Sequence, residues 1–172
     1  HRQSFIVKTE LEFVDNVFDF ADLSVREIMI PRTDMICLDL EDSLEESIET
    51  AMEERLTRYP ICDGGKDNVI GFLHIKDFLQ TLYKKETPDL RKLARHALVV
   101  PEAMAVSRLL QTMQQERSQL AIVVDEYGGT AGMVTIEDVI EEIVGDIQDE
   151  FDTDRPLVEK KGACLYSVDA KM

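Results

Sequence analysis

Short apolar runs alternate along the chain with longer segments in which apolar residues recur every three or four positions. RYPICD at Arg58–Asp63 and LAIVVD at Leu120–Asp125 are typical of buried β-strands. The stretches before them, which end in AMEER and TMQQER, carry apolar residues at helical spacing. MICLDL and ALVVPE, further upstream, each predict another short strand. The pattern therefore predicts a mixed α/β protein of short strands and amphipathic helices.

The same order of elements occurs twice. GFLHIKD at Gly71–Asp77 matches GMVTIED at Gly132–Asp138, and each copy lies between a predicted strand that ends in Asp and a predicted helix. The repeating unit is strand, helix, strand, turn, strand, helix. The polar, proline-containing stretch YKKETPDLRK separates the copies.

The repeat divides the chain into five expected segments. They are a helical lead-in at 1–22, a first repeat at 23–83, a linker at 84–90, a second repeat at 91–148 and an acidic connector at 149–172. In the lead-in, Phe5–Phe20 shows helical spacing, and the last residues, ACLYSVDAKM at Ala163–Met172, are expected to begin another strand.

Charge restricts the possible ligands. The chain has 19 Lys and Arg against 35 Asp and Glu, a formal net charge of -16. This argues against nucleic-acid binding, which relies on basic patches. An anionic ligand would need local positive charge to offset the repulsive field.

Three cysteines are present, and none belongs to a C-x-x-C motif. Cys37 and Cys62 lie in apolar runs, which predicts inert, reduced, buried thiols and a cytosolic environment. The longest apolar runs, such as LAIVV, are far shorter than a membrane helix requires.

The carboxylate-rich and glycine-rich stretch DEYGGTAGMVTIEDVIEEIVGDIQDE fails the motifs that it first suggests. Counted from Asp125, a calcium loop would need Gly at the position of Thr130 and Glu at that of Ile136. No Gly-Lys-Ser/Thr step follows the glycines, so a P-loop is excluded as well. Only three histidines occur and no nucleophile elbow is present, so we expect no enzyme activity.

The step from Thr135 to Asp138 has two interpretations. Thr135 can cap the helix that follows, with Asp138 favoured by the helix dipole. The same geometry also provides an anion site, with a carboxylate that can accept bonds from ribose hydroxyls. His74 and Asp77 occupy the equivalent positions in the first copy, although histidine is a poor cap. The residues alone leave both interpretations open.

Arg58 is the best candidate to offset phosphate charge, since Tyr59 and Pro60 beside it could line an adenine pocket. The alternative is a solvated surface charge, which is the usual state of a single arginine.

Together these features resemble a tandem pair of cystathionine-β-synthase (CBS) domains, a Bateman module, over Leu23–Ile147. VREIMIPRTDM at Val25–Met35 and the DEYGGTAG stretch resemble the CorC/HlyC family, bacterial membrane proteins linked to magnesium and cobalt efflux. The resemblance implies that each repeat forms a three-stranded sheet with flanking helices, and that the two pack as a pseudo-two-fold pair. It also implies that the lead-in follows a membrane domain, and that the C-terminal residues begin a transporter-associated domain.

The resemblance further implies an adenine-nucleotide ligand, ATP or AMP, with Mg²⁺ accompanying ATP. Phosphate and ribose contacts carry over to Thr135 and Asp138, and in the first repeat to Asp77. His74 stands where the family has a hydroxyl residue, which would make binding there depend on pH. The adenine would be lined by residues near Tyr59, Pro60, Ala121 and Ile122.

The expected function is regulation of a membrane efflux protein by nucleotide, at the cytoplasmic face of the bacterial inner membrane. The expected partners are a second copy of the chain, the membrane domain of the parent protein and the nucleotide. One alternative is a dimerisation module with degenerate clefts. Another is direct sensing of divalent cations by carboxylates of the last helix, namely Glu141, Glu142 and Asp146.

Overall fold

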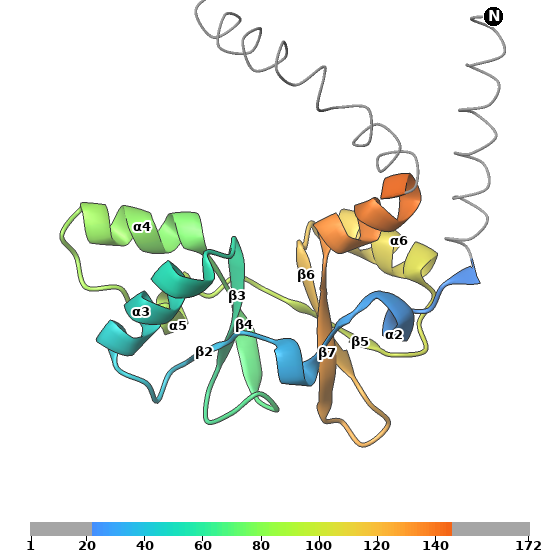
Figure 1. Cartoon of the computed structure of the whole chain (residues 1–172), viewed down its shortest axis with the longest axis horizontal. Helices are drawn as coiled ribbons and strands as arrows, with labels where there is room; N and C mark the ends of the chain where they lie inside the picture. Colours follow the sequence, from blue (N-terminus) through green and yellow to red (C-terminus); the bar gives the residue numbers. More distant parts are fainter. Residues whose placement is uncertain (1–21, 146–172) are drawn as a thin grey trace, which may run out of the picture. The chain divides into compact units, whose positions relative to one another are not determined.

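The computed structural model describes residues 22–145. The expected lead-in helix, Asp146, Cys164 and the acidic connector lie outside these residues. Two small β-sheets, each with helices against it, form the described chain (Figure 1). This confirms the prediction of two α/β repeats.

The first repeat contains a three-stranded sheet in the order β2-β3-β4. Its elements are β2 (Leu38–Asp39), α3 (Leu44–Glu54), β3 (Arg58–Cys62), β4 (Val69–His74) and α4 (Ile75–Tyr83). Strands β2 and β3 are parallel because α3 connects them, and β3 turns back into antiparallel β4. Tyr59, Leu73 and Phe78 are fully buried between the sheet and its helices.

The second repeat has the same order of elements. They are β5 (Leu98–Pro101), α6 (Val106–Glu116), β6 (Leu120–Val124), β7 (Thr130–Thr135) and a helix over 136–145. The short helix α5 (Leu90–Leu93) lies in the connection from the first repeat. The DEYGG stretch forms the turn between β6 and β7, where Gly128 has a φ of 85°. Among residues 22–145, no helix has the length and apolarity to cross a bilayer.

The start of the predicted first repeat pairs with the sheet of the second. Helix α2 (Val25–Ile28) leads into β1 (Ile30–Pro31), which pairs antiparallel with β7, and the 3-10 helix η1 (Arg32–Asp34) follows. The second sheet therefore has four strands, in the order β1-β7-β6-β5, and not the expected three. The second repeat itself supplies the three expected strands, β5, β6 and β7, and the start of the predicted first repeat adds β1 at the free edge of β7.

Gly71 and Gly132, which occupy the same position in the two repeats, allow another backbone segment to pass close to their strands. Phe72 and Arg95 exchange backbone hydrogen bonds of 2.9 and 2.8 Å, so the segment after α5 pairs with β4 much as β1 pairs with β7. A Cβ on Gly71 would lie 2.6 Å from the carbonyl oxygen of Arg95, and one on Gly132 would lie closer still to that of Ile30. Each glycine is therefore required by the close approach of a neighbouring backbone segment.

A hydrophobic cluster joins the two repeats. Met35 and Phe72 from the first repeat pack against three residues of the second, Leu120, Ile122 and Met133. All five side chains are at most 4% exposed. Cys37 and Val69 pack against the same cluster. The two sheets thus pack against each other, as the family resemblance implies.

Candidate functional site

The junction between β7 and the following helix contains the predicted cap. The amide of Asp138 donates to Oγ1 of Thr135 at 3.3 Å, and the amide of Thr135 donates to Oδ2 of Asp138 at 3.0 Å. These reciprocal bonds form a capping box and satisfy two amides at the helix start. Within residues 22–145 no other group donates to the Asp138 carboxylate, which has further acceptor capacity.

The equivalent junction in the first repeat is capped by His74. Its Nδ1 accepts a hydrogen bond of 3.1 Å from the amide of Lys76. Burial, followed by the positive charges of Arg95 and Arg58, lowers the pKa of His74. A neutral imidazole is required here because Nδ1 must accept. The expectation that histidine is a poor cap is therefore wrong at this position.

Asp77 is held by Arg95, which lies between α5 and β5 at the start of the second repeat. Nε and Nη2 of Arg95 donate to the two carboxylate oxygens of Asp77 at 2.8 and 3.0 Å. The hydrogen bonds from Arg95 lower the pKa of Asp77. The carboxylate expected to bind ribose in the first repeat is thus engaged by a bidentate ion pair.

Arg58 brings the two junctions together. Its backbone lies opposite His74 in the antiparallel pairing of β3 with β4. Its side chain reaches the second repeat. Nη1 donates to both carboxylate oxygens of Glu137 at 2.8 and 2.9 Å, and Nε donates to the side chain of Gln119 at 3.2 Å. The Arg58 side chain is only 9% exposed, so it is not a solvated surface charge. Because Glu137 precedes Asp138, this places a cation beside the second junction.

The four residues expected near adenine lie in the protein interior. Tyr59 and Ala121 are 0% exposed, and Pro60 and Ile122 are buried as well. The hydroxyl of Tyr59 donates to the carbonyl of Ala51 at 3.2 Å and accepts from the amide of Leu56 at 2.9 Å. The Tyr59 side chain therefore stabilises the core of the first repeat.

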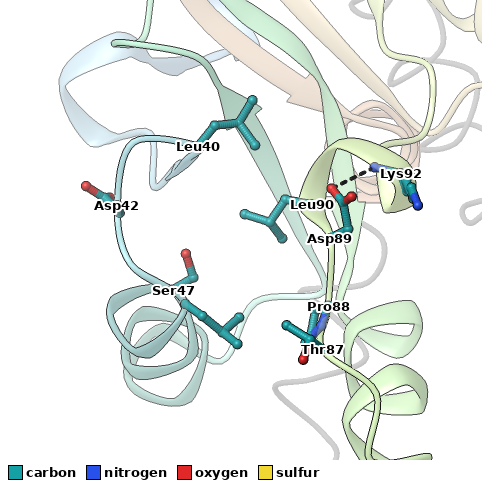
Figure 2. Close-up of a pocket in the computed structure, with 9 residues that line it drawn as sticks. Leu40, Asp42, Ser47, Thr87, Pro88, Asp89, Leu90 and Lys92 are labelled. Carbon is teal, nitrogen blue, oxygen red and sulfur yellow. Dashed lines mark hydrogen bonds between the residues drawn. The ribbon is translucent and has the colours of Figure 1, made fainter.

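Two cavities lie away from these junctions. One cavity, of about 230 Å³, lies between the repeats. The residues that line it include Val69, Gly71, Ala97, Val99, Ile122 and Thr130. Of these, only Ile122 was predicted to line the adenine. The other, of about 500 Å³, lies in the first repeat between α3 and the linker (Figure 2). Its walls include Leu40, Leu90 and the buried Ser47, and it contains no residue that the sequence predicted for a site.

The sequence analysis did not identify three residues that make contacts at the two junctions: Gln119, Glu137 and Arg95. Gln119 and Glu137 are 61 and 79 residues from Arg58 along the chain, and Arg95 is 18 residues from Asp77. Glu137 belongs to an acidic run that predicts a solvated helix face, and no local pattern indicates its pairing. Only the packing of the repeats reveals it.

The carboxylates proposed to sense divalent cations do not form a cluster in the described part of the chain. Glu141 and Glu142 are exposed. Residues 22–145 contain no cluster of three or more His, Cys, Asp or Glu side chains that could hold a metal ion.

Comparison with known proteins identifies the repeats. The CBS domain family matches residues 25–84 and 90–145. The UPF0053 protein YugS of Bacillus subtilis is 45% identical over 167 residues, which are 96% of this chain and 39% of that protein. The magnesium and cobalt efflux protein CorC of Pasteurella multocida is 43% identical over 142 residues, 82% of this chain and 47% of that protein. The chain thus spans less than half the length of both relatives.

Solved structures show the same architecture. The CBS domain of a bacterial CNNM/CorC family Mg²⁺ transporter in complex with ATP has 36% identity and a TM-score of 0.73, over 79% of this chain and 97% of that one. A CBS-domain pair with bound AMP from Klebsiella pneumoniae has 29% identity and a TM-score of 0.64, over 72% of this chain and 99% of that one. The chain therefore belongs to the CBS-domain family, as a tandem pair similar to those of CNNM/CorC-family Mg²⁺ transporters.

Proposed function

We propose that this CBS pair binds an adenine nucleotide at the second junction and thereby regulates a magnesium or cobalt efflux protein of which it is a part. The observation that carries the proposal is the position of Arg58 beside the Thr135–Asp138 step. A similar CBS domain has been solved with ATP and a CBS-domain pair with AMP, which supports an adenine nucleotide as the ligand.

The chemistry of the second junction suits this ligand. The start of the helix over 136–145 favours negative charge, and the Thr135 hydroxyl can donate to a phosphate oxygen. The free acceptor positions of Asp138 can receive ribose hydroxyls. Arg58 supplies the positive charge that a phosphate needs in a chain of net charge -16. With ATP, Mg²⁺ bound to the phosphates would relieve more of that repulsion.

The first junction is the weaker candidate. Arg95 holds both oxygens of Asp77, and the cap there is a neutral His74 in place of a hydroxyl. A nucleotide would have to displace Arg95 before Asp77 could bind ribose. We therefore assign one nucleotide to each chain, at the junction of Asp138.

Calorimetric titration with AMP, ADP and ATP, each with and without Mg²⁺, tests this assignment. We expect one nucleotide per chain in the parent protein, loss of binding in Asp138→Ala and retention in Asp77→Ala. Thermal unfolding of both variants serves as the folding control. Absence of binding at millimolar nucleotide would refute the function, and loss only in Asp77→Ala would move the site to the first junction.

We assign the pair to a homodimer, at the cytoplasmic face of the membrane that holds the efflux protein. Helices α3 and α4 cover one sheet (Figure 1). Each exposes apolar side chains. Met52 is 72% exposed on α3, and Leu79 and Tyr83 are 56% and 89% exposed on α4. We infer that these exposed apolar side chains contribute to the interface between two copies. Sedimentation of Met52→Glu/Leu79→Glu should show a monomer where the parent chain shows a dimer.

A further inference from the structure

The cavity of about 500 Å³ in the first repeat has two walls that come from different parts of the chain (Figure 2). The chain that leaves β2 and enters α3 forms one wall, with Leu40, Asp42 and Leu44. The stretch that leads into α5 forms the other, with Leu90 and Lys92. A cavity of this volume is large enough for a small molecule.

Ser47 places a buried hydroxyl in this cavity. The residue is only 3% exposed, and its hydroxyl points from α3 into the space between the two walls (Figure 2). The amide of Ser47 donates to the carbonyl of Ser43 at 3.1 Å, but within residues 22–145 the hydroxyl has no hydrogen-bond partner. A buried hydroxyl without a partner costs free energy, because it has lost its hydrogen bonds to water. A polar group of a bound molecule would supply the missing partner.

Three leucines give the cavity an apolar surface. Leu40, Leu44 and Leu90 each pack against the core of the first repeat and remain half-buried. A ligand that covered them with methylene groups would remove apolar surface from water, which is favourable in proportion to the area covered.

One unpaired charge of each sign lies on the two walls. In the described part of the chain, the Asp42 carboxylate and the Lys92 ammonium form no ion pair, whereas the neighbouring Arg91 pairs with Asp63 at 3.1 Å. Asp42 and Lys92 lie on opposite sides of the cavity (Figure 2). This arrangement is complementary to a molecule with a positive charge at one end and a negative charge at the other.

We propose that the cavity binds an ω-amino acid, a small linear zwitterion with an ammonium and a carboxylate at opposite ends of an aliphatic chain. The ammonium pairs with Asp42, the carboxylate pairs with Lys92, and the methylene groups cover the leucines. The Ser47 hydroxyl, on the same wall as Asp42, accepts a hydrogen bond from the ammonium. This inference goes beyond the proposed function, because the cavity shares no residue with the second junction.

Calorimetric titration of the full chain with 4-aminobutanoate, 5-aminopentanoate and 6-aminohexanoate tests the proposal. The controls for the best length are the diamine and the dicarboxylate of the same chain length. We expect each control to bind at least about tenfold more weakly, because one of its ends would meet a like charge. Absence of binding of all three amino acids at millimolar concentration, or equal binding of the diamine, would overturn the proposal.

Variants of the two walls locate the ligand. Asp42→Asn and Lys92→Met should each weaken binding by about two- to fivefold, the contribution of an exposed ion pair. Leu90→Trp should abolish binding, because the larger side chain fills the cavity. Glu49→Gln, at an exposed position of α3 outside the cavity, is the matched control and should bind as the parent does. Binding that none of the wall variants changes would place the ligand elsewhere and refute the proposal.

Thermal unfolding of the same variants checks their folding and the state of Ser47. Ser47→Ala should weaken binding but leave the Tm unchanged or higher, because it removes a buried hydroxyl that has no partner. A lower Tm would show that the hydroxyl is already bonded in the folded chain, which contradicts the proposal. Asp138→Ala should bind the amino acid as the parent does, so this inference and the proposed function can fail separately.

Discussion

Arg58 of the first repeat and Glu137 of the second form a bidentate ion pair, with Nη1 2.8 and 2.9 Å from the two carboxylate oxygens. The arginine side chain is 9% exposed and the glutamate 61%. The pair thus ties the two repeats together beside the junction where we place the nucleotide. At the proposed site, phosphate would compete with Glu137 for the guanidinium, and nucleotide binding would then be coupled to the contact between the repeats.

Glu137→Gln should tighten nucleotide binding, because it frees Arg58 and removes a negative charge near the phosphates. An ion pair of this exposure contributes roughly 0.5–1 kcal/mol, so we expect a gain of about two- to fivefold in affinity. Arg58→Ala should instead abolish binding. Calorimetry measures both, with Glu141→Gln as an exposed carboxylate control on the same helix. If Glu137→Gln weakened binding, Glu137 would itself contact the nucleotide.

Tyr59→Phe should destabilise the protein and leave nucleotide binding unchanged. The substitution leaves the amide of Leu56 without its partner and removes one of two donors to the buried carbonyl of Ala51, which still accepts from the amide of Arg55 at 3.2 Å. The expected loss is about 1–3 kcal/mol of unfolding free energy, measured in urea. Weaker binding with unchanged stability would show that Tyr59 contacts the adenine after all.

Gly71→Ala and Gly132→Ala should each lower the unfolding free energy by about 1–3 kcal/mol, because the new methyl group would overlap a carbonyl oxygen of the crossing segment. Gly145→Ala is the matched control, since no described atom lies within 4 Å of its added Cβ. It should leave stability unchanged or raise it by up to about 1 kcal/mol, the difference in helix propensity. Equal effects of the three substitutions would argue against the close approach.

Stability should decrease as the pH falls below the ordinary histidine pKa of about 6.5. His74 has a lowered pKa in the folded chain, so the unfolded chain takes up its proton first. The stabilisation is therefore complete above the unfolded pKa and is lost between that value and the folded pKa. Urea unfolding at several pH values from about 7.5 to 5.5 should show a steeper loss for the parent than for His74→Asn, which keeps a polar cap without a titrating ring. Parallel profiles would exclude His74 as the cause.

The local pattern was sufficient for the elements of each repeat. RYPICD and LAIVVD are strands β3 and β6, and the Thr135–Asp138 step is a helix cap. These features depend on residues close in sequence, whose alternation and capping chemistry act before any tertiary contact forms. The pairing of β1 with β7 was missed because it joins Ile30 to Met133, and nothing in either segment encodes the other.

The sequence by itself determined the repeat, its order of strands and helices, and the two junctions where a nucleotide could bind. The tertiary structure decided that Asp77 is engaged by Arg95, because Arg95 reaches it only where the segment after α5 lies along β4. It also decided that Arg58 pairs with Glu137, the residue before Asp138. These are contacts between segments far apart in the chain, and their geometry is fixed by the packing of the two sheets and not by any local preference.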